Sequence, residues 1–306
     1  MKTRTSLRLA AALVGAALAA APAARAQNTY DTTIAVRGTA QLSVNNMSGE
    51  VHVRAWDRAQ VRVLAEYDRA RVDVSATGSR VNVRTSPWRG DDNDVTFTIS
   101  VPAGSSVEIN GVSTDAEVTG VCGEVSIQTV SGDITASCLT GDATVTSVSG
   151  DVTLSDVRGG LEVGSTSGDV IVRGARGDVT ANGVSGDLTL SDIAGTTVNA
   201  ETVSGDISYG GRIADNGRYH FQTHSGDVEL RVAGTPNATV EVSTFSGDFD
   251  SDFPIVLGGD GRVSAREFQF RLGSGSAHLK LESFSGTVSL HRGSANVNTN
   301  RERDEQ

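Results

Sequence analysis

The sequence predicts an all-β chain that forms one parallel β-solenoid, with two strands per eighteen-residue coil, a right-handed course and β caps at both ends. Eight Ser-Gly-Asp or Ser-Gly-Glu triplets occur, and those at Ser131, Ser149, Ser167 and Ser185 are eighteen residues apart. An aliphatic residue follows each of these four, and apolar residues then recur at every second position, as in a strand. A second glycine series lies midway between the triplets, which indicates two turns per coil. Such a period is typical of stacked coils, because one coil cannot bury its own apolar face.

The first twenty-six residues are predicted to be a secretory signal peptide. Lys2, Arg4 and Arg8 precede an alanine-rich apolar run, and Ala24-Arg25-Ala26 is a small-x-small cleavage signal. No later stretch is long and apolar enough to span a bilayer as a helix. We therefore expect an exported protein, periplasmic, at the cell surface or secreted, with no membrane span once the signal is removed.

The rest of the chain divides by the regularity of its repeats. Residues 27–106 are predicted to be an N-terminal β region and cap, because open solenoid ends expose unpaired strand edges. Ser48-Gly49-Glu50 is an outlying triplet there, and Trp56 and Trp88 are expected to pack, with carbohydrate stacking as the alternative. Residues 107–250 form the regular solenoid and 251–295 longer coils and a C-terminal cap, since the last triplet interval is thirty-nine residues and ends at Ser-Gly-Thr. Residues 296–306 are predicted to be a disordered tail.

The glycine of each triplet is expected to have a structural role in a turn. The chain must reverse direction within about three residues, and glycine adopts positive φ at little cost. The neighbouring Ser and Asp side chains can bond to the turn backbone. The predicted turn glycines are Gly132, Gly150, Gly168, Gly186, Gly205, Gly226 and Gly247.

The triplet aspartates are candidate calcium ligands. Stacked coils would place them in a column about 4.8 Å apart, and calcium prefers carboxylate oxygens. The glycine-rich nonapeptide of calcium-binding repeats is absent, however, and two exposed carboxylates at this spacing repel by less than about 1 kcal/mol in water. The column can therefore exist without a metal, so no cofactor is expected, with calcium as the alternative. The candidate ligands are Asp133, Asp151, Asp169, Asp187, Asp206 and Asp227.

Cys122 and Cys138 are the only cysteines. Their spacing places them on adjacent coils near the same turn, along a diagonal of roughly 8 Å if the chain is extended. A disulfide and two free thiols are both compatible with an oxidising compartment. A catalytic or metal-binding pair is not expected, because no histidine is near either cysteine in the sequence.

Charge and loop length exclude several classes of function. The formal net charge of −11 disfavours nucleic acid and anionic membranes as partners. The regular coils have almost no loops from which to build a catalytic cleft, and the five histidines are scattered, so an enzyme is not expected. His224 shares a column with Val148, Val184 and Phe245, which predicts a partly buried packing role. An ice-binding threonine column is interrupted by Ile171.

Several motifs resemble a known family. They are the early SGEVHVRAWD at Ser48–Asp57, the VPAG at Val101–Gly104, the repeated V-S-G-D, the SDFP at Ser251–Pro254 and the G-S-G segment at Gly273–Gly286. Together they resemble the bacterial β-strand-repeat family of unknown function labelled "putative adhesin". The resemblance covers nearly the whole chain after the signal peptide, and it implies a β-solenoid of the cell envelope or surface with no established substrate. Thr114 and Thr287 depart from the triplet pattern.

The expected function is therefore an exported, non-catalytic, adhesin-like interaction or scaffold protein. It would present a long, flat, acidic face to an envelope or extracellular protein or to a glycan. Two alternatives stay open, namely a calcium-stabilised binding module and a polysaccharide-active β-helix enzyme.

Overall fold

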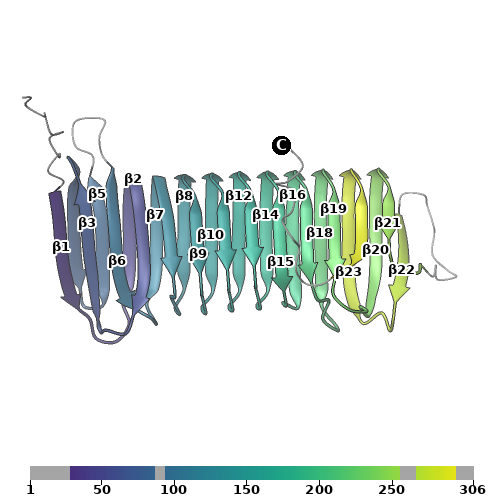
Figure 1. Ribbon diagram of the computed structural model, residues 1–306, viewed down its shortest axis with the longest axis horizontal. Helices are drawn as coiled ribbons and strands as arrows, with labels where there is room; N and C mark the ends of the chain where they lie inside the picture. Colours follow the sequence, from purple (N-terminus) through teal and green to yellow (C-terminus); the bar gives the residue numbers. More distant parts are fainter. Residues whose placement is uncertain (1–27, 87–93, 256–266, 294–306) are drawn as a thin grey trace, which may run out of the picture.

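The computed structural model describes residues 28–86, 94–255 and 267–293, and every helix or strand in these ranges is a β-strand. The strands form a long, flat, two-layered stack (Figure 1). No helix in the described ranges is long and apolar enough to cross a membrane. The predicted signal peptide, Trp88 and the predicted tail lie outside these residues.

In the regular coils a longer strand ends at the triplet and a shorter strand follows it. Equivalent strands pair in parallel, so that Val170 lies between Val152 and Leu188, and all three are at most 1% exposed. The predicted all-β solenoid is thereby confirmed. The strands are β8 (Val125–Ser131), β9 (Ile134–Ser137), β10 (Ala143–Ser149), β11 (Val152–Ser155), β12 (Leu161–Ser167), β13 (Val170–Arg173), β14 (Val179–Ser185), β15 (Leu188–Ile193), β16 (Thr197–Ser204), β17 (Ile207–Gly211), β18 (Arg218–Ser225) and β19 (Val228–Val232).

The N-terminal end of the stack is built on two long strands, β2 (Gln41–Trp56) and β7 (Ser106–Thr119), which contribute to both layers. Ser48 pairs with Ser113, so the outlying triplet stacks directly on the first regular coil. The indole N–H of Trp56, which is half-buried, donates to the carbonyl oxygen of Gln60 at 2.7 Å.

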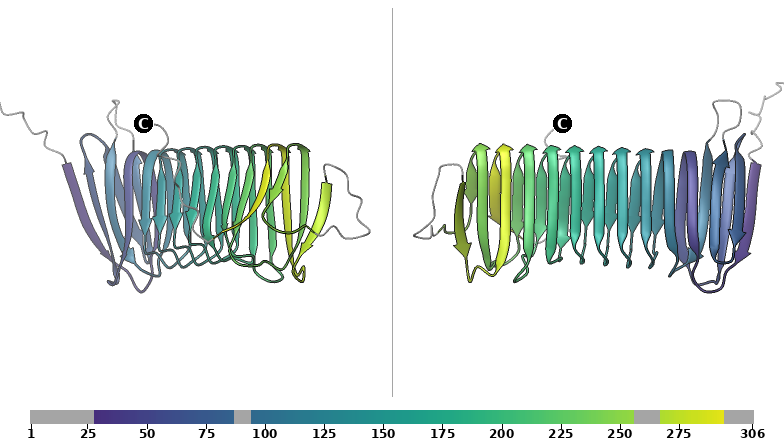
Figure 2. Two further views of the ribbon diagram at one scale, coloured as in Figure 1. Left: turned by 45° about the vertical axis from the view of Figure 1, so that its right-hand side comes forward. Right: turned by 180° about the vertical axis from the view of Figure 1, so that it is seen from behind.

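Antiparallel strands end both layers beyond β2. In one layer β5 (Arg80–Ser86) pairs with β2 and with the edge strand β4 (Arg71–Thr77). In the other layer β6 (Val95–Pro102) is followed by β3 (Gln60–Tyr67) and then β1 (Asn28–Ala35). Figure 2 shows these strands covering the N-terminal end of the stack.

At the C-terminal end the order in space differs from the order along the chain. The last coil, β23 (Ala277–Ser285) and β24 (Val288–Arg292), lies between β18–β19 and the coil formed by β20 (Ala238–Ser246) and β21 (Phe249–Ser251). In Figure 1 the yellow β23 is seen between green strands. The antiparallel β22 (Glu267–Leu272) pairs with β20 and forms the outer edge. The final coil is thus inserted into the stack instead of capping it.

The longer coils place their additional residues at the edge opposite the triplets. A bulge follows Ser191, and residues 212–217 form a short excursion after β17. The hydroxyl of Tyr219 donates to the carbonyl oxygen of Gly195 at 2.8 Å, and that of Tyr209 donates to the carbonyl oxygen of Arg212 at 3.1 Å. Burial raises the pKa of both phenols above its usual value. Both aromatic rings are therefore buried with their polar atoms satisfied.

The turn glycines are required mainly by the close approach of successive turns. A β-carbon on Gly150, whose φ is +157°, would overlap the carbonyl oxygen of Gly132. A β-carbon on Gly159, at the opposite edge and without a positive φ, would overlap the carbonyl oxygen of Gly141. An overlap with backbone of the neighbouring turn in the stack occurs at all seven predicted turn glycines, Gly132, Gly150, Gly168, Gly186, Gly205, Gly226 and Gly247.

Replacing Gly159 by alanine is expected to destabilise the protein by about 2–3 kcal/mol, because the added methyl group meets backbone that cannot move independently. Gly160→Ala is the matched control, since the nearest atom to its β-carbon is a carboxylate oxygen of Asp142 at 3.3 Å. Denaturant unfolding of the two variants measures the difference, and equal losses would contradict the steric explanation.

Because the last coil lies between two others, we expect a substitution that destabilises it to destabilise the outer coil as well. Leu281 on β23 and Val242 on β20 are both fully buried. Leu281→Asp should increase hydrogen exchange in β20–β22 as well as in β23, because β23 connects the outer coil to β18. Val242→Asp should affect the outer coil and leave the pairing of β23 with β18 protected. Mass spectrometry after exchange measures both, and equal spread from the two sites would contradict the insertion.

Candidate functional site

The edge of the stack formed by the triplets is its most regular surface, and we call it the triplet edge. Each strand of one layer ends there and the chain passes to the other layer, along the upper side of Figure 1. Ten serines align along it in the spatial order Ser48, Ser113, Ser131, Ser149, Ser167, Ser185, Ser204, Ser225, Ser285 and Ser246.

The triplet aspartates form a column in which each side chain bonds to the next coil. The backbone N–H of Asp151 donates to Oδ1 of Asp133 at 3.0 Å, and the N–H of Asp169 donates to Oδ1 of Asp151 at 2.9 Å. Seven such bonds run from Asp115 to Thr287, where the acid is absent and the column ends. These charge-assisted bonds satisfy N–H groups of the turns that would otherwise lack partners.

All six predicted calcium ligands belong to this column, and Oδ1 of each accepts a backbone N–H from the adjacent turn. Among the described residues, no three His, Cys, Asp or Glu side chains are grouped so that they could hold a metal ion. The column therefore has a structural function that requires no ion. Calcium binding stays a hypothesis for these residues.

A second column, inside the triplet edge, consists of buried hydroxyl groups that the sequence analysis did not identify. Thr223 Oγ1 donates to the carbonyl oxygen of Gly205 at 3.0 Å, and Ser283 Oγ donates to that of Gly226 at 3.0 Å. The sequence feature that could have identified this column is a Ser or Thr two residues before the serine of most triplets. The members are Thr129, Ser147, Ser165, Thr202, Thr223, Thr244 and Ser283.

An exposed apolar column runs along the outside of the same edge. Of the nine large apolar side chains that are exposed in the described ranges, eight precede a triplet serine. Each of these side chains is 42–52% exposed, so neighbouring side chains in the column cover one another only in part. The eight are Met47, Val112, Val130, Val148, Val184, Val203, Phe284 and Phe245. Apolar side chains gathered in this way usually mark an interaction surface.

His224 belongs to this exposed column, and the prediction that it is partly buried is wrong. The imidazole is exposed and stacks on the ring of Phe284, with ring centroids 4.7 Å apart. Phe245 stacks on the other face of Phe284, also at 4.7 Å and nearly parallel. The three rings form an exposed aromatic end to the apolar column.

The two cysteines are on neighbouring coils, and both are exposed free thiols in the structure. Cys138 has a positive φ of 56° at the turn after β9. Neither thiol has a histidine partner among the described contacts. A disulfide between them stays a prediction, which thiol titration of the oxidised protein would test.

A histidine between two glutamates links the first two coils on the outer face. His52 on β2 contacts Glu117 on β7 at 2.9 Å through Nδ1, and it contacts Glu50 at 3.0 Å through Nε2. Partial burial alone would lower the pKa of His52, but the hydrogen bonds and charges of the two carboxylates outweigh it and raise the pKa. The protonated imidazole is therefore favoured in the folded stack.

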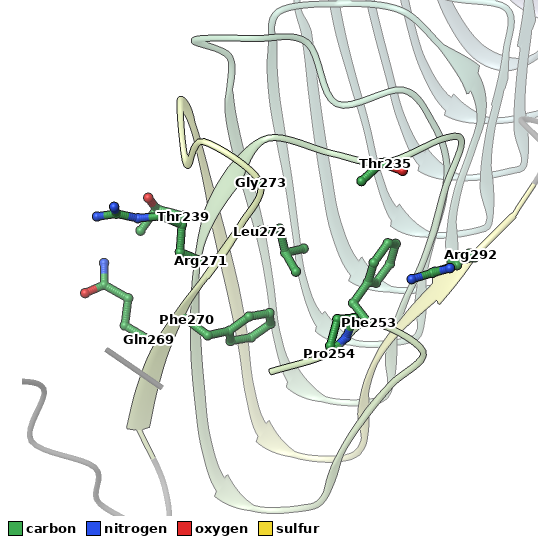
Figure 3. Close-up of a pocket in the computed structure, with 10 residues that line it drawn as sticks. All are labelled: Thr235, Thr239, Phe253, Pro254, Gln269, Phe270, Arg271, Leu272, Gly273 and Arg292. Atoms are coloured by element: carbon green, nitrogen blue, oxygen red, sulfur yellow. The ribbon is translucent and has the colours of Figure 1, made fainter. Parts of the chain in front are cut away.

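A hollow of about 680 Å³ lies at the C-terminal end of the stack, and a smaller one lies on the outer face. Figure 3 shows this end cavity, with the rings of Phe253 and Phe270 and the side chain of Leu272 facing its interior. Its lining residues are Thr235, Thr239, Phe253, Pro254, Gln269, Phe270, Arg271, Leu272, Gly273 and Arg292. Because none of these ten carries a carboxylate, imidazole or thiol, they do not provide the paired carboxylates of a glycosidase.

The smaller hollow, of about 380 Å³, lies on the outer face over β16, β18, β23 and β20 and includes one carboxylate, that of Glu241. Two of its basic side chains have an acidic partner, since Glu282 contacts both Lys280 and His220 at 2.9 Å. Burial alone would raise the pKa of Glu282, but the hydrogen bonds from Lys280 and His220 lower it overall. This hollow lacks the second carboxylate that glycoside hydrolysis requires.

Asp151 provides a test of the acid column. Asp151→Ala should cost about 1 kcal/mol more stability than Asp151→Asn, because the asparagine side chain keeps an oxygen that can accept the N–H of Asp169.

Thermal melting with calcium and with a chelator should give the same midpoint for the wild type. A midpoint several degrees higher in calcium would instead support a metal site.

The stabilisation by His52 should depend on pH. A raised folded-state pKa means that the contribution is complete below the ordinary value of 6.5 and is lost as the pH rises through the folded pKa. We expect His52→Gln to lose more stability relative to wild type at about pH 5.5 than at about pH 8.5. NMR titration should show the His52 pKa above 6.5 and a lower value in Glu117→Gln. An unchanged pKa in that variant would contradict the assignment.

Known proteins resemble the chain along most of its length. The model of the family described as "Toastrack DUF4097" matches residues 39–291, and no curated protein matches. Similar solved structures include a "putative adhesin" from Bacteroides fragilis (11% identity, TM-score 0.45, covering 87% of this chain and 98% of that one). A "putative adhesin" from Parabacteroides distasonis is also similar, with 12% identity and a TM-score of 0.43 over 87% of this chain and 98% of that one. A "putative lipid binding protein" from the same organism has 11% identity and a TM-score of 0.47 over 86% of this chain and 96% of that one. The family match spans most of the chain, which belongs to the Toastrack DUF4097 family.

Proposed function

We propose that this chain is an exported, non-catalytic, adhesin-like interaction protein that binds its partner along the triplet edge. The single observation that carries the proposal is the apolar column, which contains eight of the nine exposed large apolar side chains in the described residues. Stacking geometry explains the aspartates and buried hydroxyls of this edge, but it does not require apolar side chains that face water. A binding role accounts for them.

The geometry of the edge suits an extended contact. Ten coils at a spacing of about 4.8 Å make the edge roughly 43 Å long, and each rung is held by parallel strand pairing. A rigid surface loses little conformational entropy on binding, so more of the contact energy contributes to affinity. The adjacent carboxylates favour a partner with apolar groups and positive or neutral charge, such as an envelope protein or a glycan.

The two hollows support a function without turnover. Neither brings together the two carboxylates needed for glycoside hydrolysis. The proposed mechanism is therefore presentation of a surface, in which binding changes no covalent bond.

Export is tested by producing the full chain with its first twenty-six residues in a bacterial host. Cell fractionation, followed by protease treatment of intact cells, should recover the protein outside the cytoplasm with residues 1–26 removed. A cytoplasmic, full-length product would contradict the exported role. A protease-resistant periplasmic product would exclude adhesion between cells, and it would be consistent with a partner inside the cell envelope.

The triplet edge is tested with a triple variant, Val148→Ser, Val184→Ser and Val203→Ser. The control is Thr135→Ser, Thr153→Ser and Thr189→Ser, which alters three side chains on the outer face of the other layer. Binding of the purified proteins to isolated envelope fragments and to a glycan array should fall at least about tenfold for the valine variant only. Equal binding by both variants would contradict the proposal, and new reducing ends in the glycans would support the enzyme alternative.

A further inference from the structure

We propose that the end cavity binds a medium-chain fatty acid, with its acyl chain over the floor formed by Phe253, Phe270 and Leu272 and its carboxylate on Arg292. The cavity lies at the C-terminal end of the stack, away from most of the triplet edge, and the proposal does not depend on the proposed function (Figure 3).

The cavity exists because the two layers end differently. In one layer the antiparallel β22 extends the sheet by one strand beyond β20. In the other layer the last strand within the described residues is β21, which has three residues. No described strand lies fully opposite the inner side chains of β22, and a space of about 680 Å³ is found there. This volume is in the range of small-molecule sites.

The walls of the cavity are apolar and held in place. Phe253, Phe270 and Leu272 are each at most 5% exposed and belong to the main core of the protein. Phe270 also packs on Phe249 at 5.8 Å between ring centroids. Each methylene group that leaves water for such walls strengthens binding by about fourfold. An unbranched acyl chain supplies several methylenes in a narrow shape.

Arg292 is the cation that faces this apolar space. It pairs with Val232, a fully buried residue of the adjacent coil, and its side chain is exposed at the end of the stack. Its guanidinium lies over the ring of Phe253, 5.0 Å from the centroid. Arg271 lies on the other side of β22, next to Thr239 (Figure 3). A carboxylate at the mouth of the cavity would therefore meet Arg292.

The acid that interacts with this arginine is Asp252, which is not part of the cavity lining. The pKa of Asp252 is lowered mainly by the backbone N–H of Arg292 and, to a smaller extent, by the charges of His291 and Arg292. None of the ten lining residues carries a carboxylate. Asp252 is the nearest acid in sequence, and it accepts the backbone N–H of Arg292 at 3.0 Å and contacts His291 at 3.3 Å. No ion pair joins the Arg292 guanidinium to a carboxylate within the described residues. An arginine that lies on an aromatic ring beside an apolar space provides both parts of a fatty-acid site.

The competing explanation is that Arg292 only covers the ring of Phe253. That explanation predicts no saturable ligand and no preference for a carboxylate. The two explanations therefore differ in ligand binding, which can be measured on the folded wild-type protein.

The test uses the purified mature chain and dansyl-undecanoic acid, whose fluorescence increases in an apolar site. We expect saturable binding with one molecule per chain, displacement by laurate, and at least tenfold weaker displacement by dodecanol, which lacks the charge. Arg292→Gln should weaken laurate by about tenfold and leave dodecanol unchanged. Arg173→Gln, at an exposed position on β13, is the matched control and should bind as wild type.

A second variant tests the location. Thr235 lines the cavity and is exposed, so Thr235→Trp can fill the space without altering the core. It should block both laurate and dodecanol while the melting temperature stays unchanged. The proposal is overturned if the probe does not saturate, if Thr235→Trp binds as wild type, or if Arg292→Gln and Arg173→Gln affect laurate equally.

Discussion

The close approach of successive turns is the constraint on which the rest of the stack depends. At both edges the backbone of one turn lies against the backbone of the next so closely that a β-carbon does not fit between them. Glycine therefore recurs at the same place in the regular coils from Ser131 onward, and the interval between glycines sets the length of the strands between them. Once that length is constant, side chains eighteen positions apart must lie over one another, as Val152, Val170 and Leu188 do.

The same turns explain why the most regular polar residues need no ligand. Strand pairing is interrupted where the chain changes layer, which leaves N–H and C=O groups that must find other partners. The aspartate of each triplet supplies an acceptor for the next turn, and many of the buried Ser and Thr residues supply donors to turn carbonyls. A column of carboxylates thus satisfies backbone groups within the fold. Of the columns at this edge, the apolar one has no equivalent duty, which is why the binding proposal rests on it.

Much of the architecture could be predicted from the sequence, because its period directly records which side chains share a column. Val152 and Leu188 follow their triplets at the same offset, and the structure pairs both with Val170. The order of the last coils could not be predicted in this way. Ser285 has the offset of any other triplet serine, and a periodic pattern specifies a column without specifying which coil is the neighbour. His224 was misassigned because its column contains valines, although strand alternation from the buried Thr223 places it outside.

The candidate sites differ in the same way, because some of them repeat with the coil and others do not. The glycines and aspartates of the turns were identified from the sequence because they repeat with the coil. The end cavity could not be, since Phe253, Phe270 and Arg292 come from three separate segments that meet through the insertion of the last coil.

The inserted coil has a consequence for how such a protein can change in length. An eighteen-residue unit added or removed between Ser113 and Ser185 leaves both ends of the stack intact, because every junction there joins one coil to the next along the chain. A unit appended after β24 would have no free layer on which to dock, since β18–β19 and β20–β21 already occupy both sides of that coil. Duplication that adds a coil next to its own neighbour is therefore possible in the middle of the molecule and not directly after β24.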